Sequence, residues 1–211
     1  MTRLAGRPGE LAGLGPVDPW LTRDLATAAA RNPRTTWCLT VTDNLGHAVG
    51  HGCARPEPKS HRKRAGPGAR DRPGFAFEAT ADPRTWRLRT PGPGPDLIVT
   101  IDPVTTDPCD HRHQAGGHDP GARLRHLAQV RHATCTSPVC RRPAAQCDHE
   151  HNIPYEAGGR TCLCNTGPKC RHDHRLKQHP RWRVDQLPDG TFRWTTPAGR
   201  TDTTEPTRYP I

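Results

Sequence analysis

Apolar residues occur along this chain in short runs that are interrupted by Pro, Gly and charged residues. In two stretches they recur every three or four residues, which is the spacing of one helix face. The first stretch follows Asp18-Pro19, a helix-start signal, and ends at Asn32-Pro33. The pattern predicts helices over 20–31 and 121–132.

Other apolar runs are short and rich in β-branched and aromatic side chains, as strands are. Asp189-Gly190 is a strong turn signal between two aromatic runs and predicts a β-hairpin. Alternation along its strands places Val184 and the aromatic side chains on one face, and Arg183 and Arg193 on the other. Strands are expected at 182–184 and 192–194 in this hairpin, and at 37–42, 75–79, 85–89 and 96–102 in one small antiparallel sheet.

The composition argues against a single large hydrophobic core. Only 32% of the 211 residues are hydrophobic, and the chain contains 20 Gly and 24 Pro. We therefore expect an α+β protein of two regions, with bound metal supplying part of the missing stabilisation. The regions are 1–119, an irregular part with a helix, short strands and a disordered basic linker near 54–74, and 120–211, a compact module that ends in the hairpin.

The nine cysteines are unevenly distributed, because six of them lie from Cys135 to Cys170. No apolar run at the N-terminus resembles a signal peptide or a membrane span. In a chain of this kind, clustered cysteines indicate metal ligands before disulfides. We expect structural zinc, a reducing cytoplasmic location and no membrane partner. The remaining cysteines, Cys38, Cys53 and Cys109, are interpreted as isolated reduced thiols.

A structural zinc ion needs four ligands in a tetrahedron. Cys135 and Cys140 are five residues apart in a Pro-containing turn and supply two of them, and Cys170 is the natural third. The fourth stays open between His172, which zinc chemistry favours, and Asp173, which shares a helix face with Cys170 at i+3. Two further cysteines could replace a ligand: Cys162 and Cys164.

Other histidines are given structural rather than functional interpretations. The segment Cys109–His113 repeats the residue pattern of Cys147–His151, but only His118 lies near it as a further ligand. We therefore expect no independent metal site there. His47 and His51 are four residues apart without an accompanying cysteine or carboxylate pattern, so no site is expected at them either.

A second set of polar residues in the cysteine-rich segment has the chemistry of a catalytic site. The pattern predicts a strand over 146–153, a turn, a second strand and a helix over 169–178. His151 then lies at a strand end, Asn165 in a loop and His174 on the helix, at spacings of 14 and 9 residues. This order of elements gathers three polar side chains in one small unit.

On these residues the chain resembles the HNH endonuclease family, the His-Me finger or ββα-metal nucleases. The motifs that carry the resemblance are Glu150-His151-x-x-Pro154, Gly158-Gly159, Asn165 and Cys170-x-x-x-His174 with Lys177. It looks most like the subgroup in which an HNH module ends a longer protein with a helical domain of unknown function. The tail from Trp182 to Arg200 is similar to that subgroup, of which the chain looks like a short or truncated member.

The resemblance implies a small zinc-stabilised ββα-metal module that hydrolyses DNA phosphodiester bonds. His151 would be the general base that activates water, while Glu150 and His174 would hold one divalent ion, Mg²⁺ or Mn²⁺, on the scissile phosphate. Asn165 would orient His151 or bind that ion. Hydrolysis of a phosphodiester requires a base, neutralisation of the phosphate charge and stabilisation of the leaving oxygen. One divalent ion and one imidazole can supply all three. The candidate phosphate contacts are four basic residues: Arg160, Lys169, Arg175 and Lys177.

The charge distribution also favours a polyanionic partner such as DNA. Residues 121–211 carry 15 Lys and Arg against 8 Asp and Glu, so +7 of the net +10 lies there. The alternative is a zinc-stabilised nucleic-acid-binding module that does not cleave. Two positions depart from the family pattern: Asp173, where Cys or His is usual, and His149, where an apolar residue is common. No oligomeric state is predicted.

Overall fold

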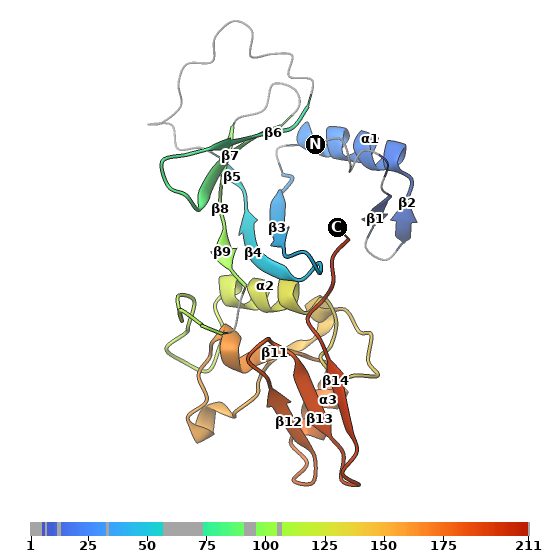
Figure 1. The fold of residues 1–211 in the computed structure, drawn as a ribbon, viewed down its shortest axis with the longest axis vertical. Helices are drawn as coiled ribbons and strands as arrows, with labels where there is room; N and C mark the ends of the chain where they lie inside the picture. The colour runs from blue at the N-terminus through green and yellow to red at the C-terminus, as the bar shows by residue number, and fades with distance from the viewer. Residues whose placement is uncertain are drawn as a thin grey trace, which may run out of the picture. The chain divides into compact units, whose positions relative to one another are not determined.

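A computed structural model of the chain shows a mixed α and β protein of short strands and three α-helices among the described residues (Figure 1). The described residues are 6, 8–11, 14–32, 34–56, 74–90, 96–104 and 107–210. They form two compact units, each of two chain segments: Met1–Leu39 with Gly52–Ile101 in unit 1, and Thr40–His51 with Asp102–Ile211 in unit 2. The division near residue 102 differs from the predicted division near 120. Most of the predicted linker, 57–73, lies outside the described residues.

Unit 1 contains the first predicted helix and a small sheet. Helix α1, Pro19–Ala30, begins where the Asp18 carboxylate accepts hydrogen bonds from the next backbone N–H groups, as a helix cap does. Leu88 and Val99 are buried on adjacent strands of the sheet. The elements of this unit are β1 (Gly9–Leu11), β2 (Gly15–Val17), α1, and the sheet β5 (Arg55–Pro56), β8 (Leu97–Thr100), β7 (Thr85–Arg89) and β6 (Ala76–Ala79) in that order.

The expectation that the strand at 37–42 joins the other early strands in one sheet is wrong. That strand, β3 (Cys38–Thr42), belongs to a separate sheet in the order β3-β4-β9, with β4 at Ala48–Cys53 and β9 at Asp102–Pro103. The sequence did not predict β4, because its two glycines and single Val give it little of the β-branched character that marks a strand.

Unit 2 is organised around helix α2, Ala122–Arg131, which was predicted from its apolar spacing. Leu124, Leu127 and Ala128 are buried and form a cluster with Val104 and Leu163. Below the helix in Figure 1, three strands lie side by side. They are β12 (Arg183–Gln186), β13 (Phe192–Thr195) and β14 (Thr201–Thr204).

The hairpin prediction is confirmed, with β14 as an additional strand. Val184 and Trp194 are buried as a cross-strand pair. Arg183 and Arg193 lie on the other face, where both contact the Asp185 carboxylate. The alternating pattern of the sequence therefore fixes which face of the hairpin packs on the unit.

The segment between α2 and the hairpin holds the predicted catalytic residues. Strand β10 (Asp148–His151) pairs antiparallel with β11 (Thr166–Lys169), and helix α3 (Arg171–Lys177) follows directly. Short 3-10 helices occupy the connections: η2 (Ala144–Gln146), η3 (Tyr155–Ala157) and η4 (Leu163–Asn165). Among the described residues, no helix is long and apolar enough to cross a membrane.

Candidate metal centre and active site

Three cysteines and one carboxylate come together from two parts of the chain. One part is the loop after α2, and the other is the junction of β11 with α3. The ligand atoms of Cys135, Cys140, Cys170 and Asp173 all lie within 4.8 Å of one another. Asp173 Oδ2 is 3.3 Å from Cys135 Sγ and 3.2 Å from Cys170 Sγ. Burial raises the pKa of the Cys135 thiol, so this group would need a bound cation to hold it as a thiolate. The group has the ligand types and number of a structural zinc site.

The fourth position of this group is occupied by Asp173 and not by His172. Cys170 is the N-cap of α3, and its Sγ accepts a hydrogen bond from Asp173 N, which turns the Asp173 side chain toward the cysteines. The His172 side chain is 82% exposed, and its Nδ1 contacts Asp173 Oδ1 at 2.9 Å. Helix geometry therefore outweighs the general preference of zinc for imidazole. Neither member of the C-x-C pair joins this group: Cys162 and Cys164 lie elsewhere.

The imidazole of His174 lies between two carboxylates of β10. Its Nδ1 is 2.8 Å from Asp148 Oδ2, and its Nε2 is 2.9 Å from Glu150 Oε2. Lys177, one turn further along α3, contacts the other oxygen of Glu150 at 3.0 Å. Asp148 was not among the predicted site residues. Its position two residues before Glu150 could have identified it, because alternate strand residues share a face.

His151 lies on the opposite side of β10, in a different environment. The residue is 2% exposed, and its Nε2 is 2.8 Å from Thr161 Oγ1. The Thr161 hydroxyl donates its proton to Gly117 O at 2.6 Å, so it can only accept from His151. The Nε2 of His151 therefore carries the proton, and Nδ1 carries the lone pair. Burial and the neighbouring His118 lower the pKa of His151, which keeps it neutral at neutral pH.

Asn165 supports a loop, and its side chain is hydrogen-bonded to backbone groups of that loop and to neither histidine. Its Oδ1 accepts from Ile153 N at 2.8 Å, and its Nδ2 donates to Ile153 O at 3.0 Å and to Arg160 O at 2.9 Å. A Cβ on Gly159 would lie 1.9 Å from Ile153 O, so the loop closes tightly around this amide. The predicted role in orienting His151 is therefore indirect at most in this conformation.

The four predicted phosphate contacts separate into two groups. Arg160 and Arg175 are exposed. Lys169 is 0% exposed, and its Nζ lies 4.3 Å from the Phe192 ring centre; burial lowers its pKa to about 7. Lys177 is engaged with Glu150, as described above. The contact of Lys169 with phosphate stays a prediction, and in this structure its ammonium lies inside the fold against Phe192.

His149 is a half-buried side chain and belongs neither to the Cys135 group nor to the His174 group. Its Nε2 is buried without a hydrogen-bond partner among the described residues. Burial, together with His151, lowers the pKa of His149 to about 3.

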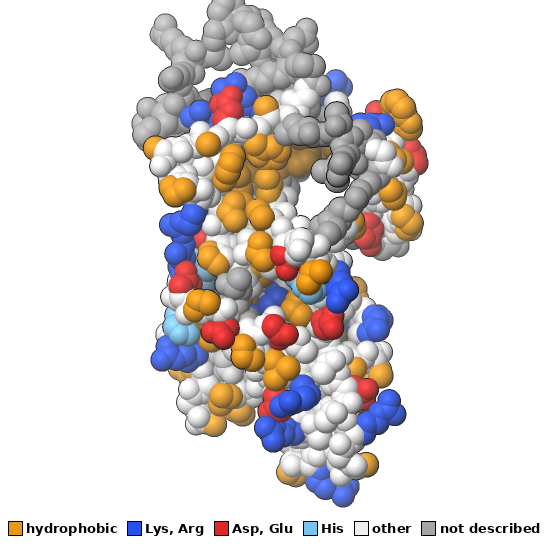
Figure 2. Space-filling model, viewed as in Figure 1, with side chains coloured by type: hydrophobic (Ala, Val, Ile, Leu, Met, Phe, Trp, Pro, Cys, Tyr) orange, Lys and Arg blue, Asp and Glu red, His pale blue; other side chains and the backbone are white. Residues whose placement is uncertain are grey.

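On the visible face of the molecule, Figure 2 shows Lys and Arg side chains scattered among carboxylates around β12–β14, without forming one basic patch.

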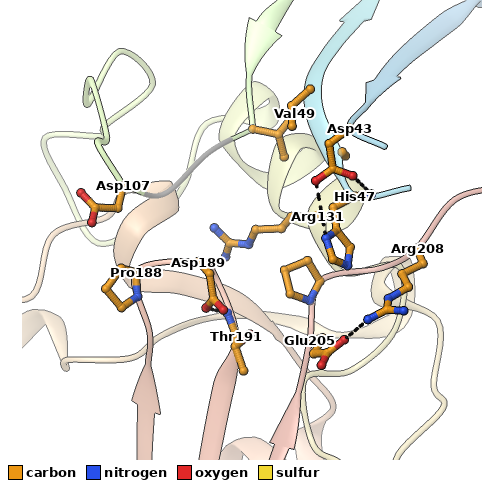
Figure 3. A pocket seen from close by; sticks show the side chains of 13 residues that line it. Asp43, His47, Val49, Asp107, Arg131, Pro188, Asp189, Thr191, Glu205 and Arg208 are labelled. Atoms are coloured by element: carbon orange, nitrogen blue, oxygen red, sulfur yellow. Dashed lines mark hydrogen bonds and ion pairs between the residues drawn. The ribbon is translucent and has the colours of Figure 1, made fainter. Parts of the chain in front are cut away.

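A separate pocket of about 330 Å³ lies on unit 2, away from these residues (Figure 3). Its lining includes Asp43 and His47 from the turn before β4, and Arg131 at the end of α2. Glu205 in its wall forms an ion pair with Arg208 at 2.8 Å. None of the predicted catalytic residues lines this pocket, so it does not contain the candidate active site.

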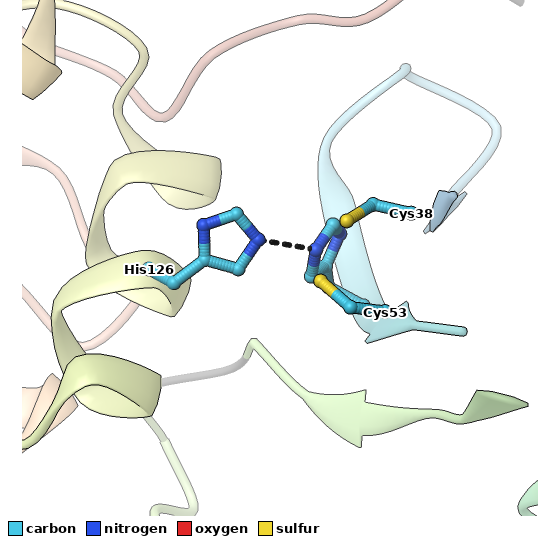
Figure 4. A group of neighbouring side chains, drawn as sticks. Cys38, Cys53 and His126 are labelled. Atoms are coloured by element: carbon cyan, nitrogen blue, oxygen red, sulfur yellow. Dashed lines mark hydrogen bonds between the residues drawn. The ribbon is translucent and has the colours of Figure 1, made fainter. Parts of the chain in front are cut away.

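Two further histidines of unit 2 are satisfied within the fold. His51 Nε2 and His126 Nε2 share a hydrogen bond at 2.8 Å (the dashed line at His126 in Figure 4). His51 Nδ1 is 2.9 Å from Thr40 Oγ1. Burial, with the neighbouring His126, lowers the pKa of His51 to about 4. Cys38 and Cys53, drawn in the same figure, belong to unit 1.

Comparison with known proteins finds relatives that are themselves uncharacterized. The chain is similar to the uncharacterized proteins Rv3776 and Rv2100 of Mycobacterium tuberculosis, with 43% identity over 88 residues in each case. These residues are 41% of this chain but only 17% and 16% of the two relatives. The chain thus spans about a sixth of the length of the relatives that it matches. No family model matches it, and no solved structure matches it.

Proposed function

We propose that unit 2 is an HNH-type, ββα-metal endonuclease that hydrolyses DNA phosphodiester bonds. One observation carries the proposal: His174 of α3 is held between the Asp148 and Glu150 carboxylates of β10, while the next strand residue, His151, is a neutral imidazole. This arrangement offers a divalent-cation site and a base within one strand–strand–helix unit. The net charge of +10 is compatible with a polyanionic substrate.

The residues present fit a divalent ion. Glu150 and His174 would hold it, since a carboxylate oxygen and an imidazole nitrogen face each other at 2.9 Å. Asp148 would orient the ring from its other nitrogen, which is the usual arrangement of a metal-bound histidine. The ion, when bound, would neutralise charge on the scissile phosphate and on the leaving oxygen.

The proposed general base is His151, acting through Nδ1. Because Thr161 fixes the proton on Nε2, the lone pair on Nδ1 is available to take a proton from water. The lowered pKa of His151 keeps that lone pair unprotonated at neutral pH. His151 and the Glu150–His174 pair lie on opposite sides of β10. We therefore propose that DNA binding brings water and the phosphate around the end of the strand, where His151 is the last residue.

The competing proposal is a zinc-stabilised module that binds nucleic acid without cleaving it. Lys177 favours it, because its ammonium occupies one oxygen of Glu150 that an ion could use. A non-cleaving module, however, has no need for a carboxylate–histidine–carboxylate arrangement beside a histidine of fixed tautomer. The two proposals differ in one measurable property, which is strand cleavage.

The test is a plasmid-nicking assay on the full chain with added Mg²⁺ or Mn²⁺. We expect nicking by the wild type, and a loss of about 100-fold or more in His151→Ala and in His174→Ala. His179→Ala, an exposed histidine just beyond α3, is the matched control and should nick normally. Equal nicking by the wild type and His151→Ala would overturn the assignment of the base. DNA binding by the wild type without nicking would favour the competing proposal.

A further inference from the structure

A second group of metal-ligand side chains shares no residue with the Cys135 group, and it was not expected from the sequence. The ligand atoms of Cys109, His111, Cys162 and Cys164 lie within 4.8 Å of one another. The sequence suggested only His118 as a partner for the Cys109–His113 segment. The structure instead brings in the C-x-C pair, which lies more than fifty residues later in the chain.

The distances in this group match those of a tetrahedral zinc site. Cys109 Sγ and Cys162 Sγ are 3.5 Å apart, and His111 Nδ1 is 3.3 Å from Cys162 Sγ and 3.8 Å from Cys164 Sγ. A zinc tetrahedron has sulfur–sulfur edges of about 3.8 Å and sulfur–nitrogen edges of about 3.6 Å. Direct S–S bonding is absent, since a disulfide would bring two sulfurs to about 2.05 Å.

We propose that Cys109, His111, Cys162 and Cys164 bind a structural zinc ion, separate from the Cys135 group. The proposal does not depend on whether the chain cleaves DNA. Three thiolates and one imidazole form a closed ligand set of the kind used in structural sites, and the softness of the sulfurs selects zinc over Mg²⁺ or Mn²⁺.

The buried guanidinium of Arg131 supports this assignment independently. Arg131 is 3% exposed and donates to Leu163 O at 2.7 Å and to Thr166 O at 2.5 Å. Among the described residues, no carboxylate forms an ion pair with the Arg131 guanidinium. The negative groups that act on it are the thiols of this cluster. Three thiolates, one neutral imidazole and Zn²⁺ leave one negative charge, which is the counter-charge that a buried arginine requires.

The backbone around the cluster holds the four ligands from both sides. His111 has a φ of 52°, a left-handed conformation that an ordinary residue adopts at a cost and that a ligated histidine can sustain. Ala115 N then donates to Thr161 O, which joins the two segments in an antiparallel bridge. On the other side, Thr166 Oγ1 donates to Cys162 O and closes the turn that carries Cys164.

The position of the cluster gives the proposed ion a structural role for the rest of the unit. Helix η4, Leu163–Asn165, begins after Cys162, contains Cys164 and leads directly into β11. An ion on Cys162 and Cys164 would fix this turn, and with it Asn165, whose amide holds the loop after β10. The segment before α2 would thereby be tied to the loop that precedes β11.

The test is the zinc content of the full chain, purified under reducing conditions and measured by inductively coupled plasma mass spectrometry. Cys109→Ser and His111→Ala should each lose one zinc per chain relative to the wild type. His179→Ala is the control and should lose none, because His179 is exposed and belongs to neither group. His111→Cys should keep the zinc, since four thiolates also form a structural site.

A second comparison separates this ion from the one expected at Cys135. Cys170→Ser should remove a different zinc, so the double variant Cys109→Ser with Cys170→Ser should lose two. Unchanged zinc content in both Cys109→Ser and His111→Ala would overturn the proposal. So would a Cys109–Cys162 disulfide found in the wild type by peptide mass spectrometry under the same conditions. Both deciding residues are partly or fully solvent-exposed, so these variants retain the buried core of the unit.

Discussion

At the residue scale, the two histidines proposed for catalysis differ in what surrounds them. His174 is flanked by the carboxylates of Asp148 and Glu150, whereas His151 is buried against Thr161. The difference follows from strand geometry, because neighbouring residues of β10 point to opposite faces. The chemical types were readable from the sequence. Which partner each imidazole contacts depends on the register of β10 with β11, which the sequence did not specify.

The first prediction concerns Asp148, which contacts the far nitrogen of the proposed metal ligand His174 and also pairs with Arg171. Asp148→Asn should raise the Mn²⁺ concentration needed for half-maximal nicking by about 10- to 100-fold, because the carboxylate that orients His174 is lost. The activity at saturating Mn²⁺ should fall much less. Asp185→Asn, which removes a carboxylate from the exposed hairpin face, is the control. Identical metal dependence in Asp148→Asn and the wild type would argue against an ion at Glu150 and His174.

The second prediction concerns the pH dependence set by His151. Its pKa is lowered from the ordinary 6.5, so the base stays competent below pH 6.5 and activity falls only as pH drops through the lowered pKa. His118, whose ring centre lies 5.0 Å from that of His151, contributes to the lowering. His118→Ala should therefore move the acid limb of the nicking profile to higher pH. His179→Ala should leave the limb in place, and a limb that does not move in His118→Ala contradicts this electrostatic coupling.

At the scale of elements, the prediction from sequence succeeded where a local signal was strong. Helices α1 and α2 and the β12–β13 hairpin follow from caps, periodicity and a turn dipeptide. The strand β4 and the third strand β14 were missed, because Ala48–Cys53 and Thr201–Thr204 carry few bulky apolar residues. These strands are stabilised by pairing with neighbours, and pairing is a tertiary property that no window of sequence contains.

The third prediction tests the turn after η3, where two consecutive glycines have different reasons to be glycine. Gly158 has a φ of +84° with open space around its Cα, so Gly158→Ala should cost about 1–2 kcal/mol of unfolding free energy. At Gly159 an added Cβ would meet Ile153 O at 1.9 Å and the Asn165 amide at 2.8 Å. Gly159→Ala should therefore cost about 3 kcal/mol or more, measured by urea unfolding. Equal losses in the two variants would show that the loop relaxes around residue 159.

At the scale of the whole molecule, a low hydrophobic content is matched by small cores and by metal-ligand groups. The apolar clusters of unit 2 are a group around α2 and a group on the β12–β13 face. The sequence indicated that metal would be needed, and it identified Cys135, Cys140 and Cys170 from their density. It could not pair Cys109 with Cys162, because ligands that α2 and β10 separate along the chain are brought together only by the tertiary fold.

The fourth prediction follows from where unit 2 begins in the chain. A fragment over 120–211, the module expected from sequence, lacks three groups that the unit uses. Val104 is buried in the cluster around α2, the Asp102 carboxylate pairs with Arg123 at 2.7 Å, and Cys109 contacts Cys162. Loss of the buried Val104 side chain alone should lower the free energy of unfolding by about 1.5–3 kcal/mol.

A fragment over 102–211 keeps all three groups, and both fragments lack the same residues 40–51. We therefore expect the longer fragment to melt at a higher temperature by circular dichroism and to retain one more zinc per chain. Equal melting temperatures and zinc contents would mean that residues 102–119 lie on the unit without stabilising it. The difference in melting temperature and zinc content between the fragments thus measures how much residues 102–119 stabilise the folded unit. The apolar contact, the ion pair and the proposed zinc ligand all lie on these eighteen residues.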